Sequence, residues 1–247
     1  MAGYGRKLWD NLEIEYDDFV RTTDKKHEEQ VQKIFEWFKQ FNKIDIKIQG
    51  ETKEFDIELG NKYLPHLLGL QYMNDSSSSI RGYALYKYIE KNNFSDKEIL
   101  EKVKNNNPRM EEAVKNRIET FQEFMENIEN AFIVEKSIPD SKTNIKSNYF
   151  IVQSKGNDFL HLGIKQENIG SFISEFDITP KKDSWLETYF SRNNITYFQD
   201  SKIIEEIKGL YKYNEDKQEF EKFAFTGKEI KYEKENNLEN VSTKIRE

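Results

Sequence analysis

The chain has 247 residues, carries a formal net charge of −7 at pH 7 and contains no cysteine, which excludes structural disulfides, iron–sulfur clusters and thiolate zinc sites. Charged residues make up 34% of it, but 18 phenylalanines, 13 tyrosines and 3 tryptophans supply enough large apolar side chains for a folded core. Residues 1–10 lack the apolar core of a signal peptide, and no later stretch approaches the roughly 18 to 20 apolar residues of a membrane span, so we expect a cytoplasmic protein with no membrane contact.

The first part of the chain predicts a helix followed by a β-hairpin. Between residues 25 and 41, apolar side chains recur with the period of an amphipathic helix. Residues 44–48 and 55–59 then alternate strictly between apolar and polar, so that each strand can bury one face and expose the other. The polar tract at residues 75–79 is predicted to be a loop.

Helices are predicted over most of the chain from residue 80 to residue 130. Residues 80–91 have a helical pattern, and Ser95 with Glu98 forms a capping box at the start of a short second helix. The longest periodic element covers residues 108–130 and begins at a proline, which favours the first turn of a helix. Its apolar stripe consists of Val114, Ile118, Phe121, Met125 and Ile128.

After residue 130 the pattern changes to that of β-strands. A turn at residues 155–157 joins the last two of three β-like runs, which cover residues 132–138, 147–154 and 158–164. Further along we expect a short helix at 183–190, a strand at 195–198, a charged helical stretch at 202–223 and a charged tail. The sequence therefore predicts an α+β fold in which an antiparallel sheet packs against several helices.

Only three histidines are present, and histidine is the side chain that ordinarily titrates near neutral pH. His27 lies among charged residues and is interpreted as a surface residue. His66 lies in the apolar run LPHLLGL, as either a reactive imidazole or a buried histidine bonded to backbone. Alternation in residues 159–164 sends His161 and Lys165 to the face opposite the leucines, as either an active-site pair or an ordinary exposed pair.

Several common catalytic motifs are absent from the sequence. It has no G-x-S-x-G elbow, P-loop, G-x-G-x-x-G or H-E-x-x-H. The sequence therefore lacks the usual motifs of α/β-hydrolases, P-loop nucleotide-binding proteins, dinucleotide-binding enzymes and zincin metalloproteases. A metal-dependent nuclease remains an alternative, suggested by Asp56, Glu58 and Lys62. Strand alternation also explains the two acidic residues, as the solvent-exposed face of a strand.

Five segments, in order, carry a resemblance to a known family. They are YLPHLLGL at residues 63–70, NRI at 116–118, residues 141–149, FLH at 159–161 and ETYF at 187–190. The chain resembles the phage-associated nucleases related to barnase, EndoU, colicins and RelE, in particular their fourth group, over about residues 53–212. The resemblance implies three regions: an N-terminal helix and first strand over 1–52, the nuclease domain over 53–212, and a charged tail over 213–247.

The resemblance implies a curved antiparallel sheet and a site that cleaves RNA without a metal ion or other cofactor, as in toxin or defence nucleases of phages and mobile elements. His66 and His161 would be the general base and the general acid, in either order. Arg117 would clamp the phosphate with its planar fork, or else would only extend from a packed helix to solvent. Thr188 would donate a hydrogen bond to phosphate, and Lys165 would bind the substrate.

A rival interpretation follows from the net charge. An excess of acidic residues disfavours non-specific binding to a phosphate backbone unless basic residues cluster locally. A non-catalytic acidic phage protein that binds and inhibits a host protein would explain that charge. The candidate partners are therefore an RNA substrate, a protein inhibitor of the nuclease, or a host protein.

Overall fold

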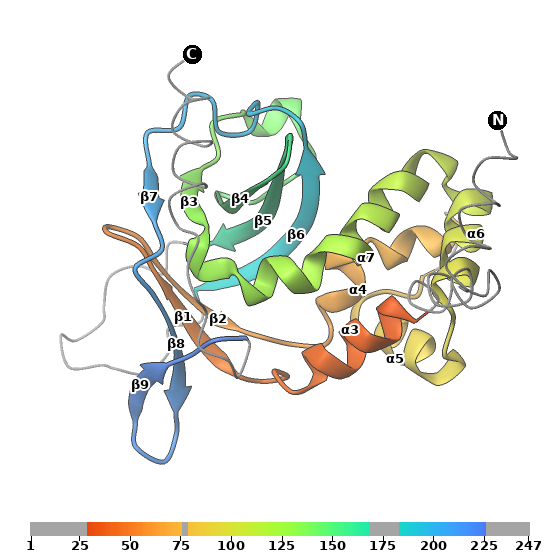
Figure 1. The fold of residues 1–247 in the computed structure, drawn as a ribbon, viewed down its shortest axis with the longest axis horizontal. Helices are drawn as coiled ribbons and strands as arrows, with labels where there is room; N and C mark the ends of the chain where they lie inside the picture. The colour runs from red at the N-terminus through yellow and green to blue at the C-terminus, as the bar shows by residue number, and fades with distance from the viewer. Residues whose placement is uncertain (1–28, 76–78, 168–182, 226–247) are drawn as a thin grey trace, which may run out of the picture.

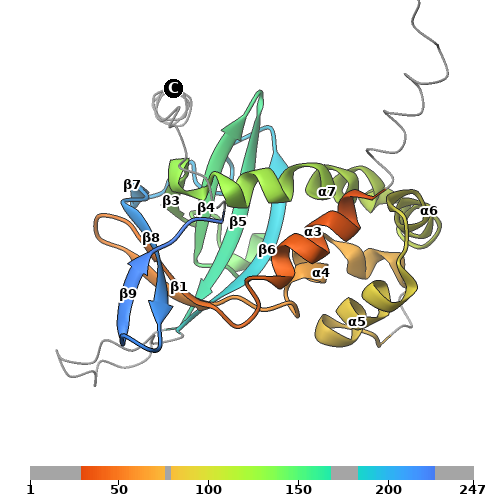
Figure 2. The same cartoon turned by 60° about the horizontal axis from the view of Figure 1, so that its bottom comes forward.

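The fold consists of a curled sheet of nine strands and five α-helices, of which α4 and α7 pack against β6 while α5 and α6 pack against other helices (Figures 1 and 2). The computed structural model describes residues 29–75, 79–167 and 183–225. The sheet order is β7-β3-β4-β5-β6-β2-β1-β8-β9, and every neighbouring pair is antiparallel except β2 and β6. The predicted α+β fold with a curved, mainly antiparallel sheet is confirmed.

The bounds of the elements follow the chain order. The strands are β1 Asp45–Gln49, β2 Glu54–Glu58, β3 Phe132–Glu135, β4 Tyr149–Lys155, β5 Asp158–Gln166, β6 Ser184–Arg192, β7 Ile204–Glu206, β8 Gly209–Asn214 and β9 Glu219–Lys222. The helices are α3 Gln30–Lys39, α4 Leu64–Leu67, α5 Gly82–Asn92, α6 Asp96–Asn106 and α7 Glu111–Glu126. Short 3-10 turns are η1 Leu70–Met73, η2 Pro108–Met110, η3 Ile128–Asn130 and η4 Asp140–Lys142.

The strands β3, β4, β5 and β6 are buried on both faces. The larger core lies between the concave face of the sheet and the helices, and α7 crosses that face in Figures 1 and 2. A second, aromatic cluster covers the opposite face of β3, β4, β5 and β6, and Phe198 packs into it from the loop that follows β6. Because neighbouring strand residues point to opposite faces, Leu160 joins the larger core while Phe159 joins the aromatic cluster.

Several sequence predictions are confirmed at the level of single elements. The hairpin of β1 and β2 forms with the expected pairing, and Ser95 and Glu98 make both bonds of the capping box at the start of α6. The predicted helix at 108–130 consists of η2, α7 and η3, and α3 is the described part of the helix predicted at 25–41. No helix among the described residues is long and apolar enough to cross a membrane.

Three local predictions were wrong. Residues 183–190 form strand β6 rather than a short helix, and the charged stretch at 202–223 forms β7, β8 and β9 rather than a helix. Residues 195–198, expected to be a strand, are a turn. A bulge breaks the alternation of β6, and β7 and β9 are edge strands, which tolerate charged side chains.

Strand pairing within the sheet connects the first and the last of the three predicted regions. β1 lies within residues 1–52 and pairs with β8, whose last residues belong to the stretch 213–247. Asp56, expected on the wet face of the hairpin, is instead buried and lies 3.6 Å from the ammonium of Lys47. The remainder of the predicted tail, residues 226–247, and His27 lie outside the described residues.

Candidate functional site

The short helix α4 presents His66 to solvent at one edge of β6. Leu64 and Leu67 are buried in the core and fix the helix in place, while the imidazole of His66 is exposed. Gly69 ends the helix with a left-handed backbone (φ +75°), and its N–H donates to the carbonyl of His66 at 3.1 Å. Pro65 in the first turn and Gly69 after the last therefore hold the imidazole on a rigid support.

The side chain of Arg117, which belongs to α7, extends to the backbone of His66. Its neighbours Val114 and Ile118 are buried, and Arg117 itself is only 8% exposed. One terminal nitrogen, Nη1, donates to the carbonyl of His66 at 3.4 Å, while Nε has no hydrogen-bond partner among the described residues. No carboxylate of the described residues forms a salt bridge with it, so a desolvated cation lies beside an exposed imidazole.

The contact between Gly69 and Arg117 explains why a glycine occupies this position. A Cβ atom on Gly69 would lie 3.1 Å from Nη1 of Arg117 and 3.1 Å from a methyl group of Val114. The positive φ at the same position further disfavours any other residue. The sequence LPHLLGL therefore provides both the support for His66 and the space for the guanidinium.

The electrostatic environment keeps His66 neutral. Although His66 is an exposed residue, the protein covers part of its ring, and this partial desolvation and then the charge of Arg117 lower the pKa of His66 below its ordinary value; Arg81 acts in the same direction. Glu187 opposes them, since its negative charge raises the pKa of His66. Burial also lowers the pKa of Arg117, but a guanidinium loses its proton so far above neutral pH that it stays charged. At neutral pH the site combines a neutral imidazole with a buried cation.

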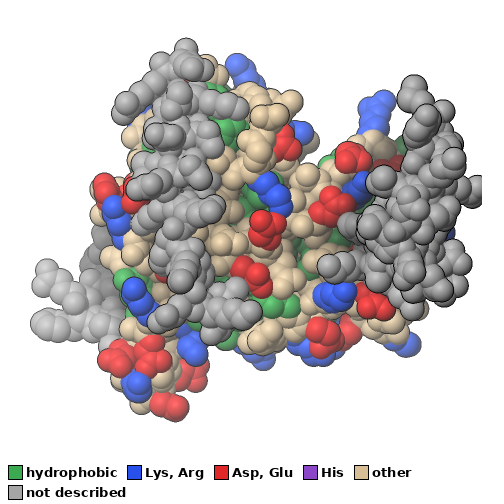
Figure 3. All heavy atoms as spheres, in the orientation of Figure 1, with side chains coloured by type: hydrophobic (Ala, Val, Ile, Leu, Met, Phe, Trp, Pro, Cys, Tyr) green, Lys and Arg blue, Asp and Glu red, His purple; other side chains and the backbone are tan. Residues whose placement is uncertain are grey.

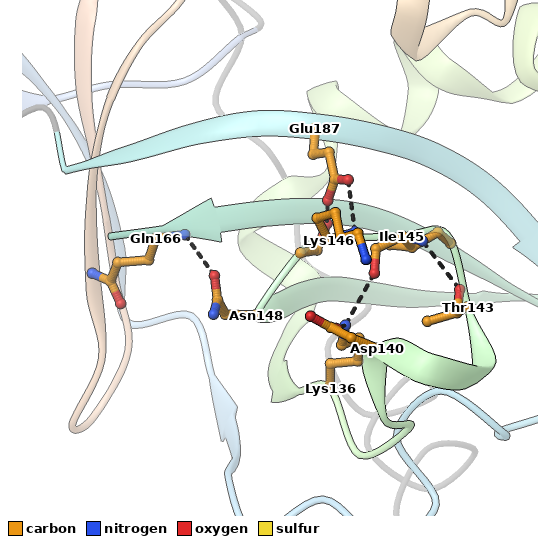
Figure 4. Close-up of polar contacts among 9 residues, drawn as sticks. Lys136, Asp140, Thr143, Ile145, Lys146, Asn148, Gln166 and Glu187 are labelled. Atoms are coloured by element: carbon orange, nitrogen blue, oxygen red, sulfur yellow. Dashed lines mark hydrogen bonds and ion pairs between the residues drawn. The ribbon is translucent and has the colours of Figure 1, made fainter. Parts of the chain in front are cut away.

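A bulge in β6 directs Glu187 away from the regular ladder. Gly163 of β5 pairs with Thr188 and Ile164 pairs with Leu186, which leaves Glu187 as the extra residue. Its carboxylate accepts hydrogen bonds from the hydroxyl of Ser147 and, at 2.7 Å, from the backbone N–H of Lys146 (Figure 4). Glu187 is therefore held in place by the loop before β4 while its charge still acts on His66.

Thr188 lies next to this group on β6. It is 8% exposed and faces Gly163, where a Cβ atom would lie 2.8 Å from the methyl group of Thr188 and 2.3 Å from the hydroxyl of Ser147. Only a glycine at position 163 lets these two side chains approach from either side. Thr188 and Ser147 thus lie close together beside the Glu187 bulge.

The structure does not bring His161 to His66. The ring of His161 has no exposed surface and stacks on Phe190 at 4.6 Å within the aromatic cluster. Its Nδ1 lies 2.9 Å from the carbonyl of Phe159, and burial lowers its pKa to about 3. Alternation placed His161 opposite the leucines of β5 as predicted, but that face is packed with aromatic rings rather than open to solvent.

A polar pocket of about 250 Å³ lies beside the Glu187 bulge. It is lined by Glu135, Lys136, Asp140, Lys146, Ser147, Asn148, Tyr149 and Gln166, several of which Figure 4 shows around the loop before β4. The ammonium of Lys136 pairs with Asp140 and donates to the carbonyl of Ile145 at 3.0 Å. The hydrogen bond and charge of Lys136 lower the pKa of Asp140 most, and the charges of Lys146 and of the predicted substrate-binding Lys165 act in the same direction.

The candidate site consists of two groups: His66 with Arg117 at α4, and Glu187 with Ser147 and Thr188 at the bulge of β6, where the charge of Glu187 acts on His66. Glu187 and Ser147 are the members that had no assigned role in the sequence analysis, although both lie in segments that carried the resemblance. Only the bulge and the approach of the loop show that these residues are neighbours. The described residues contain no group of three His, Cys, Asp or Glu side chains arranged to hold a metal ion.

Comparison with known proteins identifies a family for most of the chain. A family model described as "phage-Barnase-EndoU-ColicinE5/D-RelE like nuclease4" matches residues 30–229, which is more than half of the chain. The match covers every described helix and strand, from α3 to β9. Neither a curated protein nor a solved structure matches the chain significantly.

Proposed function

The chain belongs to the fourth family of phage nucleases related to barnase, EndoU, colicins E5 and D and RelE, and on that premise we propose that it is an endoribonuclease that cleaves RNA without a metal ion. The observation that carries this proposal is the position of Arg117, a buried cation without a carboxylate partner among the described residues and 3.4 Å from the carbonyl of an exposed histidine. A desolvated cation of this kind is suited to bind an anion that comes from outside the protein.

In the proposed reaction His66 is the general base. Its lowered pKa keeps the imidazole neutral, so it takes the proton from a ribose 2′-hydroxyl. The 2′-oxygen then forms a bond to the adjacent phosphorus while the bond from phosphorus to the 5′-oxygen breaks. The departing 5′-oxygen takes a proton from water, which has access to this site because His66 is exposed. The products are a 2′,3′-cyclic phosphate and a free 5′-hydroxyl.

Arg117 stabilises the charge that develops on the phosphate in this proposal. Its planar fork presents parallel N–H groups to two nonbridging oxygens, and low exposure strengthens the interaction. The hydroxyl of Thr188 donates a further hydrogen bond to the phosphate, and Lys165 contacts the RNA near the polar pocket. His161 takes a packing role, because a ring with no exposed surface does not reach a substrate.

The test is cleavage of a short single-stranded RNA in EDTA. We expect cleavage to continue in EDTA and to stop when the ribose at the scissile position is 2′-deoxy, because the mechanism uses that hydroxyl as the nucleophile. Cleavage that requires magnesium would support a metal-dependent nuclease instead. If the protein cleaves neither RNA nor single-stranded DNA under any of these conditions, the acidic inhibitor of a host protein becomes the better explanation of the charge of −7.

A further inference from the structure

An exposed aromatic ring lies on α5, close to the proposed site. Tyr83 is 57% exposed, the highest value among the large hydrophobic side chains of the described residues. Aromatic rings contribute most when their faces are covered, so a ring this open has surface available to a ligand. The ring belongs to the first turn of α5, which begins at Gly82.

Tyr83 is the outermost ring of a stack of three. Phe35 and Tyr86 stack at 4.8 Å with an angle of 2° between their planes, and Tyr86 and Tyr83 follow at 6.1 Å and 9°. The two inner rings are fully buried, so the stack is anchored in the core and ends at the surface. A planar ligand that covered Tyr83 would extend a column whose orientation the protein already fixes.

One basic side chain, Lys87, lies beside the two outer rings of the stack and pairs with Glu90 at 2.6 Å. The ammonium of Lys87 lies 5.6 Å from the centre of the Tyr83 ring, and Arg81 is two residues away along the chain. Between Asn61 and Asn92 the sequence has four basic and two acidic residues, the reverse of the balance in the whole chain. In Figure 3 acidic side chains gather over the β8–β9 hairpin, and acidic and basic side chains lie side by side around α3 and α5. The segment from Asn61 to Asn92 therefore has a small excess of positive charge, which disfavours a phosphate backbone less than the chain as a whole does.

The stack is also near the proposed site. A Cβ atom on Gly82 would lie 3.9 Å from the carbonyl of Lys62, so the start of α5 packs beside the turn that leads into α4 and His66. The charge of Arg81 also acts on His66. A strand whose phosphate lies at Arg117 would thus pass close to Tyr83.

We propose that Tyr83 stacks with an unpaired base of the RNA strand that the protein cleaves, close to the cleaved phosphodiester. Single-stranded nucleic acids are commonly held this way, by bases on aromatic rings and phosphates on nearby cations. A base within a duplex is already stacked on both sides, so the contact selects unpaired RNA. The inference rests on the proposed function, since it assumes the same substrate.

The test measures the affinity of the full chain for a fluorescent single-stranded oligoribonucleotide whose 2′-positions are all O-methylated, which blocks cleavage. We expect Tyr83→Ala to weaken binding by about 5- to 150-fold and Tyr83→Phe to preserve it. The matched control is Tyr88→Ala. Tyr88 lies on the same helix and is 37% exposed, but its ring packs on Phe94 at 5.5 Å, so its loss should leave affinity unchanged.

The outcomes separate this inference from the proposed function. Unchanged affinity in Tyr83→Ala, an equal loss in Tyr88→Ala, or an equal loss of affinity for a blunt RNA duplex would overturn stacking at Tyr83, whether or not the protein cleaves RNA. Conversely, a wild-type protein that binds the single strand through Tyr83 but cleaves no unmodified RNA would overturn the proposed function and leave the stacking contact standing. Circular dichroism of each variant checks that α5 is intact.

Discussion

The guanidinium of Arg117 donates a hydrogen bond to the backbone carbonyl of His66 at 3.4 Å, which joins α7 to α4 across 51 residues of sequence. The bond uses one terminal nitrogen only, and Nε has no partner among the described residues. The guanidinium of Arg117 thus keeps N–H donors that could bind a ligand. Burying such a group is costly for folding, so its presence points to a role other than stability.

Replacement of Arg117 by methionine should therefore separate stability from activity. We expect Arg117→Met to increase the free energy of unfolding by about 1 to 3 kcal/mol, because it removes a buried polar group while keeping an unbranched side chain. RNA cleavage should fall by about 10²-fold or more in Arg117→Met, and Arg117→Lys should be nearly as inactive, since lysine keeps the charge but loses the fork. Urea unfolding and initial cleavage rates measure the two effects. A fully active Arg117→Lys would contradict the clamp.

Gly69 and Gly156 offer a matched pair of substitutions. Both have positive φ, but a Cβ atom on Gly69 would press on Arg117 whereas one on Gly156 would meet nothing within 4 Å. Each change to alanine should cost about 1 kcal/mol of stability from the backbone alone. Only Gly69→Ala should also reduce cleavage, because it displaces the guanidinium. Equal cleavage rates for the two variants, corrected for the folded fraction, would show that the position of Arg117 does not matter.

His66 should control the acidic limb of the pH–rate profile. A general base must be neutral, so kcat/KM should rise with pH through a limb whose midpoint lies below pH 6.5, the ordinary value that the environment of His66 lowers. His66→Gln should reduce kcat by about 10²- to 10⁴-fold, remove that limb and leave RNA affinity nearly unchanged.

Arg117→Met also tests the electrostatic interaction between Arg117 and His66. Because the charge of Arg117 lowers the pKa of His66, an NMR titration of Arg117→Met should give a higher imidazole pKa than the wild type. An identical pKa in both proteins would mean that the two side chains do not interact in solution.

His161 should affect stability rather than cleavage. Its pKa is lowered to about 3 in the folded chain but is near 6.5 when unfolded, so below pH 6.5 the unfolded chain binds the proton and gains stability. The contribution of His161 is complete above pH 6.5, and about 2 kcal/mol of it is lost on going from pH 7 to pH 5. His161→Phe should reduce the pH dependence of the unfolding free energy by that amount and leave cleavage at pH 7 within a few-fold. A loss of 10²-fold or more would return His161 to the active site.

The helices and the first hairpin could be predicted because their signals are local. The apolar stripe of α7 and the capping box of α6 lie within a few residues of one another, and both reflect the side of the element that is buried. The strands from β6 to β9 were harder to predict for two different reasons. Glu187 interrupts the alternation of β6, and the short edge strands β7 and β9 carry charges, as helix surfaces also do.

The site could be predicted only in part. The run around His66 identified a fixed imidazole, and Arg117 was among the expected residues, but their contact spans two helices and no pattern in the sequence gives it. For His161 the alternation was read correctly, yet whether a sheet face meets water depends on what covers it. Here Phe198 and Tyr197, from a loop more than thirty residues later, pack against the ring.

The pairing of β1 with β8 determines how the molecule is completed during biosynthesis. The β1–β2 hairpin, α4 and α7 leave the ribosome early, whereas β8 is among the last described strands to be made. Until then the free edge of β1 presents unpaired backbone groups, and Glu187 has not yet reached His66 for much of that time. His66 and Arg117 are therefore translated long before the sheet that supports them is whole, and the nascent chain is not yet a complete nuclease.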